Sequence, residues 1–308
     1  MQTLFPMLPK PPHYQPDLPR FLLYTNSFTP EKLAQFLQQS EQVQQLAEWN
    51  IFEYHCVLLQ HPDPAQYITL AHQLSFDLFI LSATPLLDQA GLLVMDMDST
   101  AIEIECIDEV AKLAGTGEMV AAITESAMRG ELDFKQSLRR RVATLKGASA
   151  TILDQVRNHL PIMSGLERTL TELQKLGWKV AIASGGFTYF AEVLQQKFGL
   201  VAVYANRFQI KDGFLTGEVE GEIVDAQYKA NVLQQLAQQH HIDIQQCIAI
   251  GDGANDLLMM QAAGLGVAYH AKPKVQQQAQ TMVNFADLTA LLCILSANQQ
   301  DFYFQQQK

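Results

Sequence analysis

Four short apolar runs, each followed by small or acidic residues, constrain the fold of this chain most strongly. The runs are LLVM, KVAIA, CIAI and LGVAY, and helical patterns lie between them at 166–176, 187–198, 227–240 and 256–263. Continuous apolar runs of this length are typical of parallel strands covered on both faces. Their alternation with helices predicts an α/β fold built on a doubly wound parallel sheet. In such a sheet the functional site lies just beyond the carboxyl ends of the strands.

Two insertions interrupt this alternation. From Asp98 to Ser184 the chain runs for 86 positions, against about 30 residues in an ordinary strand–helix–strand unit. The excess is helical in pattern and is punctuated by glycines, which predicts a helical cap at about 104–163 inserted after the first core strand. The second insertion is FQIKDGFLTGEVEG, in which Asp212-Gly213 predicts a β-hairpin.

The first 85 residues differ in character from the rest. Residues 1–20 hold six of the twelve prolines and predict a flexible, poorly packed leader, because proline fixes φ and removes a backbone donor. Residues 21–85 predict a small α/β domain without a chemical motif, and residues 86–308 form the domain with the site. The expected elements of the small domain are strand FLLY, a helix from Thr29 to about Trp49, strand IFEYHCVLL, a helix from Pro64 to about Leu74, and strand LFILS.

Charge and cysteine content narrow the function. A formal net charge of −11 disfavours nucleic-acid binding. No apolar run reaches the roughly 18 residues of a membrane span, and the N-terminus lacks the apolar region of a secretory signal. The four cysteines lie far apart with no CxxC pair, which disfavours a disulfide framework or a zinc site and favours the reducing cytoplasm.

The strongest local signal is DMDST, directly after LLVM. Asp96 and Asp98 leave a strand end one residue apart, so both can approach one point if the chain turns there. An ionised aspartate can attack phosphorus, and its neighbour can donate and recover a proton. Paired carboxylates also attract Mg²⁺. The alternative is an acidic N-cap on the following segment, and DxD alone does not decide between the two.

Two weaker signals follow. Ser184-Gly185-Gly186 comes directly after KVAIA, where a hydroxyl and glycine amides can hold phosphate oxygens; alone, such a sequence is more often a simple turn. Lys229 lies near the start of a predicted helix, where it could neutralise a phosphoryl group, although a lone helical lysine is usually a solvated surface residue.

GDGAND after CIAI is more specific. Asp252 could complete the Mg²⁺ site, and Asn255 could bind phosphate or hold the loop. Asp256 could cap the next helix or orient a metal-bound water. The alternative is a turn rich in Asx residues. Each of the four motifs has a non-catalytic explanation of its own. A single functional site explains all four at once, so we prefer it.

In this order, DMDST, SGG, Lys229 and GDGAND resemble the four motifs of the haloacid dehalogenase superfamily of phosphohydrolases. From about 91 to 291 the chain is most similar to the superfamily's phosphoserine phosphatases, with IECIDEVAKLAG, FKQSLRRRV and ANR as supporting pieces. Residues 1–85 lie outside the resemblance. They take the place of the amino-acid-binding ACT-type modules of some relatives, but their expected βαβαβ order lacks one ACT strand.

The resemblance implies roles for individual residues. Asp96 would be the nucleophile and Asp98 the general acid and base, with Mg²⁺ held by Asp96, the backbone carbonyl of Asp98, and Asp252. The expected phosphoryl ligands are Ser184, Gly185, Lys229 and Asn255. Glu105 would accept the substrate ammonium and Arg141 its carboxylate. Among three consecutive arginines, Arg141 is chosen by alignment with the family. Phe134 and Met128 fall where the cap packs over substrate.

The implied reaction is Mg²⁺-dependent hydrolysis of O-phospho-L-serine to L-serine and phosphate through an aspartyl phosphate, the last step of L-serine biosynthesis. The alternatives are transfer of the phosphoryl group to another small alcohol, hydrolysis of a different small phosphomonoester, and an amino-acid-sensing module with secondary phosphatase activity. We expect phosphoserine as the small-molecule partner, no nucleic acid and no membrane, and a homodimer as one assembly open to the chain.

Overall fold

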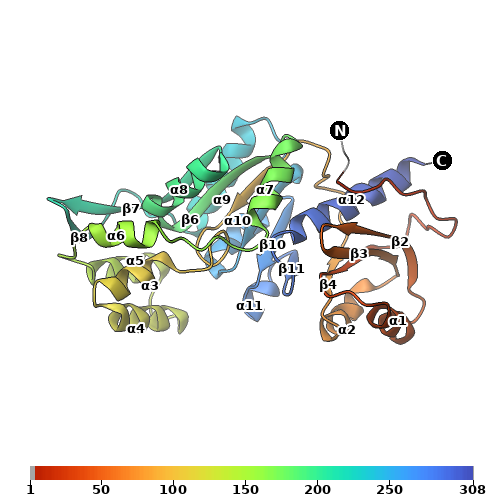
Figure 1. Ribbon diagram of the computed structural model, residues 1–308, viewed down its shortest axis with the longest axis horizontal. Helices are drawn as coiled ribbons and strands as arrows, with labels where there is room; N and C mark the ends of the chain where they lie inside the picture. Colours follow the sequence, from red (N-terminus) through yellow and green to blue (C-terminus); the bar gives the residue numbers. More distant parts are fainter. Residues whose placement is uncertain (1–3, 308) are drawn as a thin grey trace.

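The computed structural model describes residues 4–307, which form two α/β parts joined by a long C-terminal helix. Residues 1–3 and 308 are outside the described part. Figure 1 shows the N-terminal module at one end of the molecule, the cap helices at the other end, and the large sheet between them. Helix α12 (Ala290–Gln306) runs from the core along the sheet of the N-terminal module (Figure 1).

The core sheet has seven strands in the order β11-β10-β9-β5-β6-β7-β8. All neighbouring pairs are parallel except β7 and β8, which are antiparallel. This confirms the predicted doubly wound sheet. Its strands are β5 (Leu92–Met95), β6 (Lys179–Phe187), β7 (Ala202–Lys211), β8 (Phe214–Glu220), β9 (Cys247–Gly251), β10 (Leu265–Tyr269) and β11 (Thr281–Val283).

Helices cover both faces of this sheet, and the alternation of side chains along β5 shows how. Leu92 and Val94 pack with the helices α9 and α10. Leu93 and Met95 belong to the cluster that includes α7, α8 and α12. A central strand buried on both faces therefore carries an unbroken apolar run. The helices are α7 (Leu166–Lys175), α8 (Thr188–Phe198), α9 (Ala226–Gln239), α10 (Leu257–Ala262) and α11 (Pro273–Gln276), with 3₁₀ turns η2 (Ile244–Gln246) and η3 (Ala254–Asp256).

The helical cap lies between β5 and β6 in sequence, as predicted. Its helices are α3 (Cys106–Leu113), α4 (Gly117–Met128), α5 (Phe134–Ala143) and α6 (Thr151–Arg157). The predicted hairpin turns at Asp212 and Gly213, both with positive φ. The hairpin contacts the cap, because the N–H of Gly147 donates to the carbonyl of Leu215 on β8 (2.8 Å) and that of Ala150 to the carbonyl of Gly213 in the turn (2.8 Å).

The N-terminal module is a βαββαβ unit with an antiparallel sheet in the order β2-β3-β1-β4. This is the split βαβ, or ferredoxin-like, arrangement. The expected βαβαβ order was wrong, because it missed one strand. The elements are β1 (Arg20–Thr25), α1 (Pro30–Gln39), β2 (Gln44–Ile51), β3 (Tyr54–Gln60), η1 (Pro64–Tyr67), α2 (Ile68–Gln73) and β4 (Asp77–Ile80).

The missed strand is β2, which we expected to continue the first helix to about Trp49. The helix ends instead at Gln39, and β2 pairs with β3 through a tight turn at Phe52. The glutamine-rich sequence has good helix propensity. Pairing with β3 wins because it buries Leu46, Trp49 and Ile51 in the large core cluster that includes α12.

The expectation of a poorly packed leader was wrong for residues 4–19. Phe5 and Tyr14 are buried in the core cluster. The Tyr14 hydroxyl donates to Oδ1 of Asp301 on α12 (2.9 Å), and the N–H of Leu8 donates to Oε1 of Gln300 (3.2 Å). The leader contains two turns, in which the N–H of Tyr14 donates to the carbonyl of Pro11 and that of Leu18 to the carbonyl of Gln15. Side chains of α12 supply partners for other parts of its backbone.

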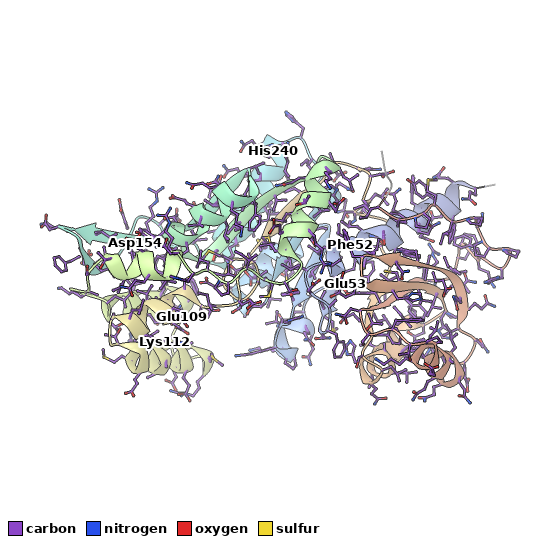
Figure 2. All side chains as sticks on the ribbon, viewed as in Figure 1. Phe52, Glu53, Glu109, Lys112, Asp154 and His240 are labelled. Carbon is purple, nitrogen blue, oxygen red and sulfur yellow. The ribbon has the colours of Figure 1, made fainter. Side chains whose placement is uncertain are left out.

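Further contacts join the N-terminal module to the core. Phe52 and Glu53 lie on the edge of the module that faces the core (Figure 2). Arg168 on α7 pairs with Glu53 and with Asp287 (3.0 Å). The buried carboxylate of Asp77 accepts three backbone N–H groups from residues 284–286. Among residues 4–307, no helix combines the length and apolar character needed to cross a membrane.

Candidate active site

The four sequence motifs meet at the carboxyl edge of the core sheet. Asp96 follows the central strand β5, and its N–H donates to the carbonyl of Ile250 on β9 (3.0 Å). Asp252 follows β9, and Ser184 lies near the end of β6 on the other side of β5. Lys229 reaches the same edge from the first turn of α9. The parallel topology therefore brings together residues that are up to 156 positions apart.

Asp96 is nearly buried and its carboxylate is held in place by two donors. Its Oδ1 accepts the N–H of Met97 (2.7 Å) and pairs with Nζ of Lys229 (3.0 Å). Lys229 also pairs with Oδ1 of Asp256 (2.7 Å), and neither Lys229 nor Asp256 exposes any of its side chain. A buried lysine needs such partners.

The charges in this group are mutually stabilised. Burial by itself lowers the pKa of Lys229, but the carboxylates of Asp256 and Asp96 outweigh it, and the pKa rises above its ordinary value. Lys229 is therefore cationic. Burial and the charge of Asp96 raise the pKa of Asp256 to about 6, against the opposing effect of Lys229. One fixed cation thus lies directly beside the candidate nucleophile, Asp96.

Asp98 is in a different environment from Asp96. The chain turns sharply after β5, with three successive N–H groups, of residues 100–102, donating to the carbonyl of Met97, and with Ser99 in the left-handed region. Oδ1 of Asp98 is buried without a hydrogen-bond partner among the described residues. Burial, then the charges of Glu105 and Asp96, raise the pKa of Asp98 well above its usual range. These surroundings favour the protonated form of Asp98, which is the form that a proton donor needs.

Ser184, Gly185 and Gly186 form a tight loop. Neighbouring side chains leave no room for a Cβ atom at either glycine. The hydroxyl oxygen of Ser184 accepts the N–H of Gly186 (3.0 Å). A Cβ at Gly186 would lie 2.8 Å from Oδ2 of Asp98. A Cβ at Gly185 would lie 2.7 Å from Cζ of Phe134 and 3.7 Å from Nδ2 of Asn255. The loop therefore lies between the cap, the turn after β5 and the GDGAND loop.

A cluster of carboxylates offers a cation site. Oxygens of Asp96, Asp252 and Asp256 all lie within 4.8 Å of one another. Burial, then the charges of Asp96 and Asp256, raise the pKa of Asp252 to about 8, so a further cation would relieve a real repulsion. A set of oxygen donors suits a hard cation such as Mg²⁺. The side chain of Asp98 is not part of this cluster.

The cap contributes a carboxylate and a guanidinium. Oε1 of Glu105 accepts the Ser99 hydroxyl (2.8 Å), and burial raises the pKa of Glu105. Arg141 is partly buried, and its Nε has no hydrogen-bond partner within the described chain; Arg139 and Arg140 are exposed. Burial lowers the pKa of Arg141, while the charges of Glu105 and Asp108 oppose that effect. Arg141 is therefore the one arginine of the three that turns inward.

Two other cap residues were predicted to cover the substrate. Phe134 does lie against Gly185. Met128 is 65% exposed, and its sulfur lies 3.7 Å from Nζ of Lys272 on the core. A second contact between cap and core is the ion pair of Lys135 with Asp225, the N-cap of α9 (2.8 Å).

Sequence reasoning missed part of the site. It gave Asp256 only a capping or water-orienting role. Oδ2 of Asp256 does accept the N–H of Gly253 (3.0 Å), but its Oδ1 binds Lys229. The hydroxyl of Thr100 lies 3.5 Å from Oδ1 of Asp252 and is fully buried. Thr100 is the last residue of DMDST and Asp256 is the last residue of GDGAND. Their position inside these motifs is the sequence signal that could have identified them.

The comparisons agree with this geometry. The model of the haloacid dehalogenase-like hydrolases matches residues 93–261. The chain belongs to this family. Within it, a phosphoserine phosphatase of Haemophilus influenzae is 60% identical over 279 residues, covering 90% of this chain and 89% of that protein. A phosphoserine phosphatase of Vibrio cholerae is 53% identical over 249 residues, covering 81% and 76%.

Solved structures extend the likeness to the whole fold. The unliganded crystal structure of a probable phosphoserine phosphatase from Vibrio cholerae superposes with a TM-score of 0.84 at 48% identity, covering 94% of this chain and 89% of that one. Because 94% of this chain is matched, the likeness includes the N-terminal module. A substrate-bound phosphoserine phosphatase complex gives a TM-score of 0.63 at 39% identity, covering 66% of this chain and 97% of that one.

Proposed function

We propose that this chain is a phosphoserine phosphatase, which hydrolyses O-phospho-L-serine to L-serine and phosphate as the last step of L-serine biosynthesis. The observation that carries the proposal is the pair of unlike carboxyl groups at the end of β5. Asp96 is held by Lys229 (3.0 Å), and Asp98 is buried with a raised pKa and with an Oδ1 that has no hydrogen-bond partner among residues 4–307. Relatives up to 60% identical that are phosphoserine phosphatases support the choice of substrate.

The two carboxyl groups divide the chemistry. An oxygen of Asp96 forms a bond to phosphorus while the bond between phosphorus and the serine oxygen breaks, and Asp98 gives its proton to that oxygen. Water then attacks the phosphorus of the aspartyl phosphate and passes a proton to Asp98. Asp96 leaves as a carboxylate and phosphate is released. Burial, which raises the pKa of Asp98, and the ion pair of Asp96 with Lys229 thus give the two carboxyl groups different roles.

Four residues would hold the phosphoryl oxygens. Lys229 supplies a fixed positive charge, which is worth most where charge develops in a buried site. Ser184 and Gly185 supply a hydroxyl and a backbone N–H, and Asn255 supplies an amide whose nitrogen lies beside Gly185. Because these groups are already in place, little reorganisation is needed when phosphoserine binds.

A magnesium ion would be held by Asp96 and Asp252, with Asp98 contributing its backbone carbonyl. Asp256 completes the acidic cluster, but it also binds Lys229, so we assign it to positioning that lysine. When bound, Mg²⁺ neutralises phosphate charge and orients the phosphoryl group for in-line attack.

The cap would select the substrate. Glu105 suits the serine ammonium, and the guanidinium of Arg141 suits its carboxylate. The two side chains have opposite charges, lie on different helical segments of the cap and are both partly desolvated. A phosphomonoester without an amino-acid group would offer no ammonium to Glu105 and no carboxylate to Arg141, and the loss of these two contacts would cost binding energy. We therefore expect discrimination for phosphoserine.

The first test is phosphate release from L-phosphoserine, with Mg²⁺ and with a chelator, beside a generic aryl phosphate. Fast release that depends on Mg²⁺ and prefers phosphoserine supports the proposal. Equal activity on the aryl phosphate would discard the assignment of Glu105 and Arg141. Asp96→Asn should abolish turnover without unfolding the chain, and near-normal turnover of that variant would contradict its role as nucleophile. Excess of another alcohol should yield no phosphorylated product.

The remaining proposals concern organisation. We infer a division into the small domain, 21–85, and the phosphatase domain, 86–308, with the cap at about 104–163. A cytoplasmic location is supported by the four cysteines, all free and buried. A homodimer stays a prediction, to be checked by light scattering.

A further inference from the structure

Asn206 lies where the strand pairing beside the phosphate loop is interrupted. In the ladder between β6 and β7, Ala183 is opposite Tyr204, and the next pair is Phe187 with Asn206. Three residues of β6, 184–186, therefore face a single residue of β7. Such a bulge re-aims a strand, and here it pushes the loop into the active site. Bulging also removes the ladder partners of the loop's backbone, and buried backbone groups need replacements.

The side chain of Asn206 supplies the replacement. It is 1% exposed, and its Nδ2 donates to the carbonyl oxygen of Gly185 (2.8 Å). The peptide unit is planar and trans, so holding the Gly185 carbonyl also sets the direction of the Gly186 N–H. That N–H donates to the hydroxyl oxygen of Ser184 (3.0 Å). Asn206 thus fixes, through one peptide plane, the orientation of the Ser184 hydroxyl.

The other end of the same amide reaches the helix that carries Lys229. Oδ1 of Asn206 accepts the N–H of Val224 (2.9 Å). Val224 precedes Asp225, whose side chain caps α9 by accepting the N–H of Tyr228 (2.9 Å). The first helical hydrogen bond of α9 runs from the N–H of Lys229 to the carbonyl of Asp225 (3.0 Å). Asn206 therefore also fixes the start of the helix from which Lys229 projects.

We propose that Asn206 is a positioning residue that holds the Ser184 hydroxyl and the Lys229 ammonium at the spacing that a phosphoryl group requires. It contacts neither the substrate nor the reacting atoms. Only a side chain with one donor and one acceptor at this reach satisfies both contacts. Aspartate would place an oxygen against the Gly185 carbonyl, and alanine would leave both backbone groups without a partner. The inference rests on the proposed function for the phosphate-binding roles of Ser184 and Lys229.

The test separates the phosphate half of the site from the amino-acid half. Inorganic phosphate meets Ser184 and Lys229, which Asn206 positions, whereas L-serine meets Glu105 and Arg141 on the cap. In Asn206→Asp and Asn206→Ala we expect the inhibition constant for inorganic phosphate to rise about five- to a hundredfold, the range that follows from one misplaced charge-assisted contact. The inhibition constant for L-serine should stay within twofold of the wild type.

The matched control is Asn231→Asp, the same chemical change on the exposed face of α9, where Oδ1 of Asn231 accepts the side-chain N–H of Gln227 (2.9 Å). It should leave both inhibition constants unchanged. Thermal unfolding checks that the variants fold, and the alanine variant carries the test if the buried aspartate prevents folding. Unchanged phosphate inhibition in a folded variant, or equal loss for serine and phosphate, would overturn the inference. If phosphoserine is not the substrate, the inhibition constant for inorganic phosphate can be measured on the hydrolysis of an aryl phosphate instead.

Discussion

Replacing Gly185 by alanine perturbs the contact between the cap and the phosphate loop. The new Cβ would lie 2.7 Å from Cζ of Phe134, about 0.7 Å short of ordinary van der Waals contact. Asn206 holds the Gly185 carbonyl in place, so Phe134 has to yield. Phe134 begins α5, and Arg141 lies seven residues later, on the same face of that helix. Moving the ring outward therefore lifts Arg141 away from the substrate.

The structure sets the size of the effect. A misplacement of about 1 Å can cost about a hundredfold in rate, so a shift of about 0.7 Å in the cap should lower kcat/KM for phosphoserine about ten- to a hundredfold. Hydrolysis of an aryl phosphate, which does not use Arg141, should fall less. The melting temperature should change little, because the substitution removes no side chain from the core and leaves no buried polar group unpaired.

The assay is a double-mutant cycle on phosphate release. In a Phe134→Ala background the obstacle is gone, so Gly185→Ala should cost less than threefold there. Gly117→Ala is the matched control, since its Cβ would lie 3.5 Å from Cγ of Lys112, an ordinary contact. An equal loss from Gly185→Ala with and without Phe134 would refute the reasoning, because the clash would then lie elsewhere.

Two further predictions concern buried charge. Lys229→Met should abolish turnover and lower the free energy of unfolding by about 3–5 kcal/mol, because it leaves Asp96 and Asp256 buried without a cation. Urea denaturation measures the loss of stability, and an unchanged urea midpoint would contradict the ion-pair argument. Burial, then the charge of Asp301, raise the pKa of Tyr14 to about 12 from 10.0, so its stabilising contribution is complete below pH 10 and is lost as the pH rises towards 12. Tyr14→Phe should make the loss of stability over this range less steep, and urea midpoints with the same pH slope as the wild type would contradict it.

The sequence predicted the chemical site because its signals are local. Each motif directly follows an apolar run or begins a helix, and parallel topology then brings strand ends to one edge. The same holds for the hairpin at Asp212-Gly213, where both residues have the positive φ that this turn requires. The inward direction of Arg141 came from alignment with the family, and the burial of Arg141 beside exposed Arg139 and Arg140 agrees with it.

What the sequence by itself determined is therefore the core sheet, the cap and the order of the motifs. Tertiary structure alone decided the rest. Strand β2 forms because β3 and α12 bury its apolar side chains, which outweighs the helix propensity of its glutamines. The leader packs because α12 offers Gln300 and Asp301 as partners. Asp256 and Asn206 gain their roles only when segments distant in sequence meet. Propensity acts within a few residues, whereas burial and hydrogen bonding depend on neighbours that only the folded chain supplies.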